Sequence, residues 1–314
     1  MNAKGKKIFV GLSGGVDSAV SAALLKKAGA LVTGVFIKGW YPEGMPCTWA
    51  EERHDAMRTA ARLQIPFRTL DASAEYKKSV IDYLLAEYRA GRTPNPDVMC
   101  NKEIKFGVFY RYALSQGADA IATGHYRSGE KNQSYFLWAV PKEILSKTFF
   151  PVGEMKKEEV RKLAKKFNIP VSEKKDSQGI CFLGAVSAKE FLIKELGTDN
   201  PALLYTLGQR VSSLGGGERQ YVVGKNVEKK ELIVSKSRQQ ETVSEIKFTD
   251  ANWFSDQTNA ATAQCRYRGR FTPGKIEGER FIASEPLQEI PTPGQSIVFY
   301  DAGGELVGGG IITE

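Results

Sequence analysis

Gly11-Leu12-Ser13-Gly14-Gly15-Val16-Asp17-Ser18 is the stretch around which the chain is organised. It follows a short apolar run, Ile8-Phe9-Val10, of the length typical of a buried parallel strand. Val16, Val20 and Leu24 then recur at four-residue steps, the spacing of one face of a helix. We therefore predict a strand, a glycine-rich turn and a helix in direct succession.

The residue types in this turn suit an anion. Two adjacent glycines let the backbone approach a ligand closely, and a helix N-terminus presents unpaired N–H groups with a favourable dipole. Ser13 and Ser18 add hydroxyl donors, whereas the lysine of the usual P-loop is missing. Asp17 within the nest indicates a divalent cation, Mg²⁺, or a positioning hydrogen bond beside phosphates. The alternative interpretation is a tight turn without a ligand.

Composition narrows the function class. The chain has 314 residues and a net charge of +8. No segment approaches the roughly 20 apolar residues that span a bilayer, and no signal-peptide core is seen, so we expect a cytoplasmic protein without membrane contact. Each lysine pair, such as Lys156-Lys157, is expected to be a solvated face. The summed positive charge favours an acidic partner such as RNA.

Strand and helix patterns alternate along the first half. Residues 31–37 and 66–70 have strand patterns, Thr48-Trp49-Ala50-Glu51 has the form of a capping box for a helix to about residue 64, and residues 74–90 are helical. This alternation predicts an α/β fold with a doubly wound parallel sheet and ligand chemistry at the carboxyl ends of its strands.

Residues 93–101 contain two prolines and are expected to form an irregular loop. A helix over 102–116 and an apolar strand over 120–125, which ends in Gly124-His125, are expected to follow. From about Tyr205 onward glycines multiply and short strand patterns replace helical periodicity. A C-terminal β-barrel or sandwich is the natural prediction.

Two of the four cysteines have the surroundings of reactive thiols. Cys100 precedes a predicted helix in a polar loop, and Cys181 follows two lysines in a glycine-containing turn. Both settings lower a thiol pKa. Cys47 and Cys265 complete the set, which has no zinc-like spacing.

Seven blocks in order resemble the tRNA-specific 2-thiouridylase family of MnmA type, which carries the PP-loop of the ATP pyrophosphatases. They are Gly11 to Ser18, Gly91 to Asp97, Cys100 to Phe106, Ala122 to Tyr126, Lys175 to Ser177, Gly179 to Phe182 and Thr292 to Gln295. The resemblance spans the chain. It implies a PP-loop domain over 1–190, a shortened central domain over 191–238 and a C-terminal β-barrel over 239–314.

The resemblance also implies residue roles. Catalytic residues would be Cys181 as persulfide carrier, Cys100 as the partner that forms a transient disulfide with it, and Asp97 as a proton acceptor. ATP would be held by Gly11, Leu12, Ser13, Gly14, Gly15, Val16, Asp17, Ser18, Ile37 and Gly124, with Asp17 on the metal. Asn95, Pro96 and Asp97 would hold the uridine, and His125, Lys131, Asn132, Gln133, Arg266, Tyr267 and Gln295 would contact tRNA. For His125, a core histidine bonded to backbone is the alternative.

The implied function is ATP-dependent 2-thiolation of the wobble uridine of tRNA. The implied partners are tRNA and a persulfide donor, either a cysteine desulfurase or a sulfur-relay protein. The link between Gly197 and Thr206 is shorter than the family's central region.

Three alternatives remain open at this stage. An amidating PP-loop synthetase would need no paired thiols. An iron-sulfur thiolase could use Cys47, Cys100 and Cys181, with Asp97 as a fourth ligand. A non-catalytic tRNA-binding protein would tolerate the loss of Asp17.

Overall fold

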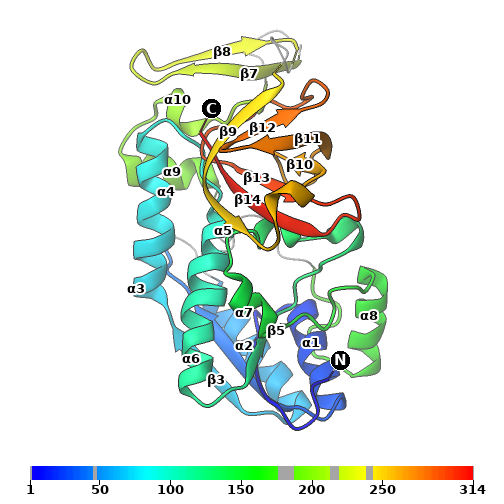
Figure 1. Ribbon diagram of the computed structural model, residues 1–314. Coiled ribbons are helices and arrows are strands. Elements are labelled where there is room, and N and C mark those ends of the chain that lie inside the picture. Colours follow the sequence, from blue (N-terminus) through cyan, green and yellow to red (C-terminus); the bar gives the residue numbers. More distant parts are fainter. Residues whose placement is uncertain (1, 45–47, 176–186, 213–218, 238–242, 314) are drawn as a thin grey trace. The chain divides into compact units, whose positions relative to one another are not determined.

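The computed structural model describes residues 2–44, 48–175, 187–212, 219–237 and 243–313 (Figure 1). Its contacts divide the chain into two compact units, which we describe separately. The first unit comprises residues 1–80 and 97–186, and the second comprises residues 81–96 and 187–314. The three-domain division expected from the sequence stays a prediction.

A five-stranded parallel sheet forms the centre of the first unit. Its strands are β1 (Lys7–Gly11), β2 (Leu31–Lys38), β3 (Phe67–Asp71), β4 (Ala120–Ala122) and β5 (Thr148–Phe149). They lie in the order β3-β2-β1-β4-β5, and every neighbouring pair is parallel. The predicted parallel sheet is therefore confirmed, with β1 at its centre.

Helices cover both faces of this sheet. Ile8 and Val10 of β1 pack with α1 (Val16–Lys27), α2 (Trp49–Leu63) and α8 (Lys157–Lys166), whereas Phe9 points to the other face. There it packs with residues of a π-helical segment (Cys100–Val108) and of α6 (Phe109–Ser115). The alternation along one central strand explains why the fold is doubly wound.

The remaining elements of the first unit are short. They are α3 (Ser73–Tyr76), a π-helical segment (Lys77–Ile81) that continues into the second unit, α5 (Pro96–Met99), α7 (Lys142–Ser146) and two 3₁₀ turns (Gly129–Lys131 and Ser134–Phe136).

Two local predictions were wrong. Thr48 does not form the predicted capping box: its backbone is in the α region, and its hydroxyl donates to the Glu52 carboxylate at 3.3 Å. The segment before Cys100 is not an irregular loop throughout, because Pro96 begins α5 and the helical backbone then continues through Cys100. Proline at a first helical position loses no intrahelical hydrogen bond, so Pro96 starts the helix instead of preventing it.

The second unit contains helices α4 (Asp82–Arg89), α9 (Ala188–Leu196) and α10 (Pro201–Leu204) and a three-stranded antiparallel sheet. The sheet has the order β6-β7-β8, with β6 (Arg210–Ser212), β7 (Arg219–Asn226) and β8 (Glu231–Ser235). Ser187 caps α9, because its hydroxyl accepts a hydrogen bond from the Glu190 N–H at 3.1 Å. This cap agrees with the Ser-Ala-Lys-Glu pattern of the sequence.

A closed barrel completes this unit and confirms the predicted C-terminal β-barrel. Its strands follow the order β10-β11-β12-β9-β14-β13. They are β9 (Glu245–Trp253), β10 (Thr262–Gln264), β11 (Thr272–Glu277), β12 (Arg280–Ala283), β13 (Ser296–Tyr300) and β14 (Leu306–Ile312), with a 3₁₀ turn at Gln257–Asn259. Phe299 lies in the barrel core, with its ring centroid 5.1 Å from that of Phe248 and 5.3 Å from that of Trp253.

None of the helices in the described ranges is long and apolar enough to cross a membrane.

Candidate functional site

A cavity of about 280 Å³ opens in the first unit. It lies where strands β1, β2 and β4 end, the edge at which parallel sheets bind ligands. Ten of the residues predicted from the sequence line it: Gly11, Leu12, Ser13, Asp17, Ser18, Ile37, Cys100, Gly124, His125 and Gln133. The chain thus brings together the glycine-rich turn, one candidate thiol and part of the predicted tRNA-contacting set.

Two glycines allow the turn to pack as it does. Gly14 has φ +76°, and a Cβ there would lie 2.4 Å from the Glu52 carbonyl oxygen on α2. Gly124, just after β4, lies so close to the start of α1 that its Cβ would be 2.8 Å from the Ser18 nitrogen. Any side chain at either position would displace backbone, which explains why glycine is needed.

The turn is tightened by its own serines. Ser18 Oγ accepts a hydrogen bond from the Ser13 N–H and donates to the Gly15 carbonyl, each at 3.2 Å. Gly15 precedes α1, and among the described residues no side chain caps that helix. The first N–H groups of α1 are therefore not capped by a side chain from the described part of the chain and lie at the positive end of the helix dipole, an arrangement that suits an anion. Val16, the first residue of α1, is buried.

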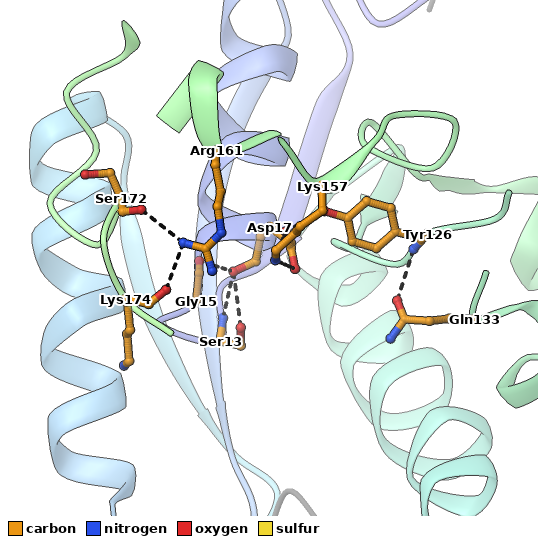
Figure 2. A network of polar contacts seen from close by, with 10 residues as sticks. Ser13, Gly15, Asp17, Tyr126, Gln133, Lys157, Arg161, Ser172 and Lys174 are labelled. Atoms are coloured by element: carbon orange, nitrogen blue, oxygen red, sulfur yellow. Dashed lines mark hydrogen bonds and ion pairs between the residues drawn. The ribbon is translucent and has the colours of Figure 1, made fainter. Parts of the chain in front are cut away.

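Asp17 is held by two side chains that sequence reasoning missed. Lys157 Nζ lies 2.7 and 2.8 Å from the two carboxylate oxygens of Asp17, and the Tyr126 hydroxyl donates to Asp17 Oδ1 at 2.7 Å (Figure 2). The Lys157 side chain is only 15% exposed, so the expectation of a solvated lysine was wrong at this position. A separation of 140 residues hides this pair from any local sequence pattern.

The surroundings of Asp17 suit a magnesium ion that is shared with phosphate oxygens. Among the described residues, no group of three or more His, Cys, Asp or Glu side chains could hold a metal ion. One carboxylate beside a phosphate nest still fits Mg²⁺, which usually takes one or two carboxylates and completes its coordination with phosphates and water.

Cys100 reaches the cavity from a buried position. Its residue surface is 3% exposed, and it lies three residues after the half-buried Asp97 along continuous helical backbone. Cys181 lies outside the described residues, as does Cys47, so the predicted disulfide stays a prediction. Cys265 belongs to the barrel core, where burial raises the pKa of its thiol to about 12, which suits a structural cysteine.

His125 faces the same cavity among aromatic rings. Its Nδ1 lies 2.8 Å from the Thr123 hydroxyl, and its ring centroid is 5.7 Å from that of Phe106. Burial, with a smaller effect of the charge on Lys105, lowers the pKa of His125 from 6.5 to about 3. The imidazole is therefore neutral at physiological pH.

Glu52 is a cavity-lining acid that the sequence reading did not single out. Burial raises its pKa above the usual 4.5, against the opposing effects of the Lys174 charge and the hydrogen bond from Thr48. Its position opposite Gly14 becomes visible only once α2 is folded against the turn.

Hydrogen bonds within the chain hold part of the loop at residues 131–133, which was predicted to contact tRNA. The Asn132 side-chain oxygen accepts from the Ser134 N–H at 2.9 Å, and the Gln133 side-chain oxygen accepts from the Tyr126 N–H at 3.1 Å. Lys131 is half-buried at the end of a 3₁₀ turn. These bonds fix the loop, and its contact with tRNA stays a prediction.

The second unit carries the other predicted substrate contacts. Gln295 Nε2 donates to the carbonyl oxygens of Thr93 and Pro94, which directly precede Asn95 and Pro96. The Arg266 guanidinium donates to the Thr292 hydroxyl at 3.1 Å and to the Leu207 carbonyl. Tyr267 lies under the Arg268 guanidinium, 5.2 Å from ring centroid to Cζ.

Two family descriptions match the chain. The tRNA methyl transferase HUP domain matches residues 6–185, and the aminomethyltransferase beta-barrel domain matches residues 243–312. These ranges contain the parallel sheet and the closed barrel, respectively.

Curated relatives match nearly the whole chain. The tRNA-specific 2-thiouridylase MnmA of Bacillus cytotoxicus is 39% identical over 353 aligned positions, which cover 98% of this chain and 95% of the relative. The protein of the same name from Oceanobacillus iheyensis is 40% identical, with coverages of 99% and 96%. Both alignments exceed the 314 residues of this chain, so each relative has residues that this chain lacks.

Solved structures give weaker likenesses. The U34-tRNA thiolase NcsA from Methanococcus maripaludis, solved with its [4Fe-4S] cluster, is 18% identical with a TM-score of 0.40. The match covers 62% of this chain and 68% of that one. At this level neither the cluster nor the substrate of that protein transfers to this chain.

Proposed function

Because the chain belongs to the tRNA-specific 2-thiouridylase (MnmA) family, we propose that it replaces the 2-oxygen of the wobble uridine of tRNA with sulfur at the expense of ATP. The observation that supports this most directly is that Cys100 lines the same cavity as the glycine-rich turn. A thiol in the same cavity as an anion nest suits a reaction in which a phosphate-activated carbon accepts sulfur.

ATP is needed because the uridine carbonyl is a poor electrophile. The 2-oxygen attacks the α-phosphorus of ATP, pyrophosphate leaves, and AMP stays on that oxygen as a good leaving group. In this scheme the turn from Gly11 to Ser18 holds the phosphates, and Ile37 and Gly124, which line the same cavity, contact the nucleoside. A single-stranded anticodon loop lets the base leave its stack at low cost.

Sulfur transfer then uses the two thiols. The terminal sulfur of a Cys181 persulfide attacks carbon 2, and AMP departs with the original oxygen. The Cys100 thiolate attacks the inner sulfur, which breaks the sulfur–sulfur bond, leaves the thiocarbonyl on the base and forms a Cys100–Cys181 disulfide. A thiol reductant must then reduce that disulfide. Asp97, on the helix that leads to Cys100, accepts a proton in this scheme.

Magnesium would bind Asp17 together with the nucleotide phosphates and supply charge neutralisation. Three further elements complete the proposal: Asn95, Pro96 and Asp97 hold the uridine; His125, Lys131, Asn132, Gln133, Arg266, Tyr267 and Gln295 contact tRNA; and a cysteine desulfurase or sulfur-relay protein delivers the persulfide.

Mass spectrometry of nucleosides tests the function. Unmodified tRNA incubated with the protein, ATP, magnesium, a persulfide donor and a thiol reductant is expected to yield 2-thiouridine and equimolar AMP. Cys100→Ser is expected to form AMP but little 2-thiouridine from a persulfide donor, whereas Cys265→Ser, which changes a barrel-core thiol, should retain the activity. Wild-type protein that yields no 2-thiouridine under these conditions would contradict the proposal.

The alternatives give different results in the same assay. An amidating synthetase would remain active after replacement of both Cys100 and Cys181. An iron-sulfur thiolase would contain iron and absorb visible light after anaerobic purification, and it would lose activity with a chelator. We expect neither behaviour.

A further inference from the structure

Lys157 brings a positive charge to the anion nest from a distant part of the chain. Its ammonium group binds both oxygens of Asp17, the first-turn acid of α1, at 2.7 and 2.8 Å (Figure 2). The sequence of the turn itself has no lysine between Gly11 and Ser18. The fold therefore supplies in space the cation that the usual phosphate loop carries in its own sequence.

Packing fixes the place of this lysine. Lys157 is the first residue of α8, whose Val160 and Ala164 are buried in the same apolar cluster as Val16 and Val20 of α1. The two helices thus form one rigid support. Lys157 Nζ also lies 5.9 Å from the ring centroid of Tyr126, whose hydroxyl donates to the same carboxylate.

One turn further along α8, Arg161 fixes another segment. Its guanidinium donates to the carbonyl oxygens of Ser172 and Lys174 at 3.4 and 3.3 Å (Figure 2). Lys157 and Arg161 thus both contact other segments of the first unit, because they share one face of α8 at a four-residue spacing.

The opposite charges of Asp17 and Lys157 determine how the nest meets an anion. Asp17 is the acid of a turn built for a polyphosphate, and an unscreened carboxylate there would repel the ligand. Lys157 neutralises it while the nest is empty. When magnesium and nucleotide arrive, the carboxylate gains a second cation and the ammonium group gains anionic oxygens as alternative partners.

We propose that Lys157 is the phosphate-binding cation of this nest: it is paired with Asp17 in the free protein and moves onto the pyrophosphate that leaves during adenylation. This inference rests on the proposed function for the identity of the leaving group. The rival explanation is structural, with Lys157 serving only to neutralise Asp17 and hold α8 against α1.

Binding of inorganic pyrophosphate, measured by isothermal titration calorimetry without magnesium, separates these explanations. Asp17→Asn removes the negative charge that competes with pyrophosphate for the Lys157 ammonium group, and it is expected to tighten pyrophosphate binding about fivefold or more. Adding Lys157→Gln to Asp17→Asn also removes the ammonium charge and is expected to weaken pyrophosphate binding about tenfold relative to Asp17→Asn alone, the size of a lost charge-assisted hydrogen bond. Lys157→Arg should keep most of the affinity.

Lys162→Ala is the matched control, because it removes the same charge from an exposed position of the same helix. It should leave pyrophosphate binding within about twofold of wild type. Equal pyrophosphate affinities for Asp17→Asn and for the double variant, both folded by circular dichroism, would overturn the inference and leave the proposed function standing. Normal pyrophosphate binding by a wild-type protein that never makes 2-thiouridine would overturn the proposed function instead.

Discussion

Gln295 of the barrel unit holds the backbone at Thr93, with its side-chain amide donating to the Thr93 carbonyl at 2.8 Å and to the Pro94 carbonyl at 3.1 Å. The contact is reciprocal, because the Thr93 N–H donates to the Pro293 carbonyl at 2.9 Å. Gly294 has φ +91°, and a Cβ there would lie 2.9 Å from the Thr93 backbone. The Thr292-Pro293-Gly294-Gln295 motif therefore clamps the segment that leads into Asn95.

Gln295→Ala tests what this amide does. The change leaves two backbone carbonyls without their donor and should lower the free energy of unfolding by about 1–2 kcal/mol, measured by urea denaturation. Gln288→Ala, at an exposed position of the same unit, is the control and should be neutral. Unchanged stability with weakened tRNA binding would show that Gln295 acts as a direct tRNA contact, as the sequence predicted, and not as a clamp.

Gly14 and Gly5 offer a matched pair for the glycine-rich turn. Both have φ +76°, but a Cβ at Gly5 meets nothing within 4 Å, whereas one at Gly14 meets the Glu52 carbonyl oxygen at 2.4 Å. Gly5→Ala should cost about 1–2 kcal/mol of unfolding free energy for the left-handed backbone alone. Gly14→Ala should cost about 1–3 kcal/mol more from overpacking and should abolish ATP binding. Equal losses in thermal denaturation would contradict the packing argument.

The order of elements around this turn could be predicted from local sequence, because apolar run, paired glycines and helical periodicity all agree between residues 7 and 27. The predicted Thr48 cap does not form, since the Thr48 backbone is already in the α region and its hydroxyl meets the Glu52 carboxylate one turn along the helix in place of a backbone N–H. Cys100 lines the cavity, but its expected place in an irregular loop was wrong, because a proline can begin a helix as well as end one.

Contacts between segments that are far apart in the chain could not be predicted from the sequence. Asp17 was predicted as a metal ligand, and nothing in its own motif indicates that Lys157 and Tyr126 bind its carboxylate. Gln295 was associated with tRNA through resemblance, whereas its contact with Thr93 depends on the folding of the barrel unit. Such pairs form only when the folded chain packs distant segments together, and one sequence without its fold does not reveal them.

His125 makes stability depend on pH. Its pKa is about 3 in the folded protein and about 6.5 in the unfolded chain, so between these values the unfolded state binds more protons. The contribution of the neutral imidazole to the free energy of unfolding is fully present above pH 6.5. It is lost as the pH falls toward 3, by up to about 1.4 kcal/mol per pH unit.

Urea denaturation at pH 7 and pH 5 measures this contribution. Between pH 7 and pH 5, the free energy of unfolding of the wild-type protein should fall by about 2 kcal/mol more than that of His125→Asn. The asparagine amide of this variant can still meet the Thr123 hydroxyl. The only other histidine, His54, is exposed on α2, and His54→Asn should keep the wild-type dependence. A pH dependence that is the same in all three proteins would rule out a buried neutral imidazole at position 125.

The salt dependence of tRNA binding tests Lys131 and Arg266. Each phosphate contact contributes roughly 0.7 to 0.9 to the slope of log K against log salt, so removing one contact makes the slope shallower by that amount. Lys131→Ala should make the slope shallower by this amount. Two hydrogen bonds of Arg266 go to Leu207 and Thr292, and the planar guanidinium has five donors, so it can still reach a phosphate.

Arg266→Ala should therefore change two measurements at once. Losing the bonds to Leu207 and Thr292 should lower the free energy of unfolding by about 1–3 kcal/mol, and losing the phosphate contact should also make the slope shallower. Lys162→Ala, an exposed charge on α8, should change neither. If filter binding gives the wild-type slope for folded Arg266→Ala while urea denaturation shows the loss of stability, Arg266 holds the barrel unit together and does not bind tRNA.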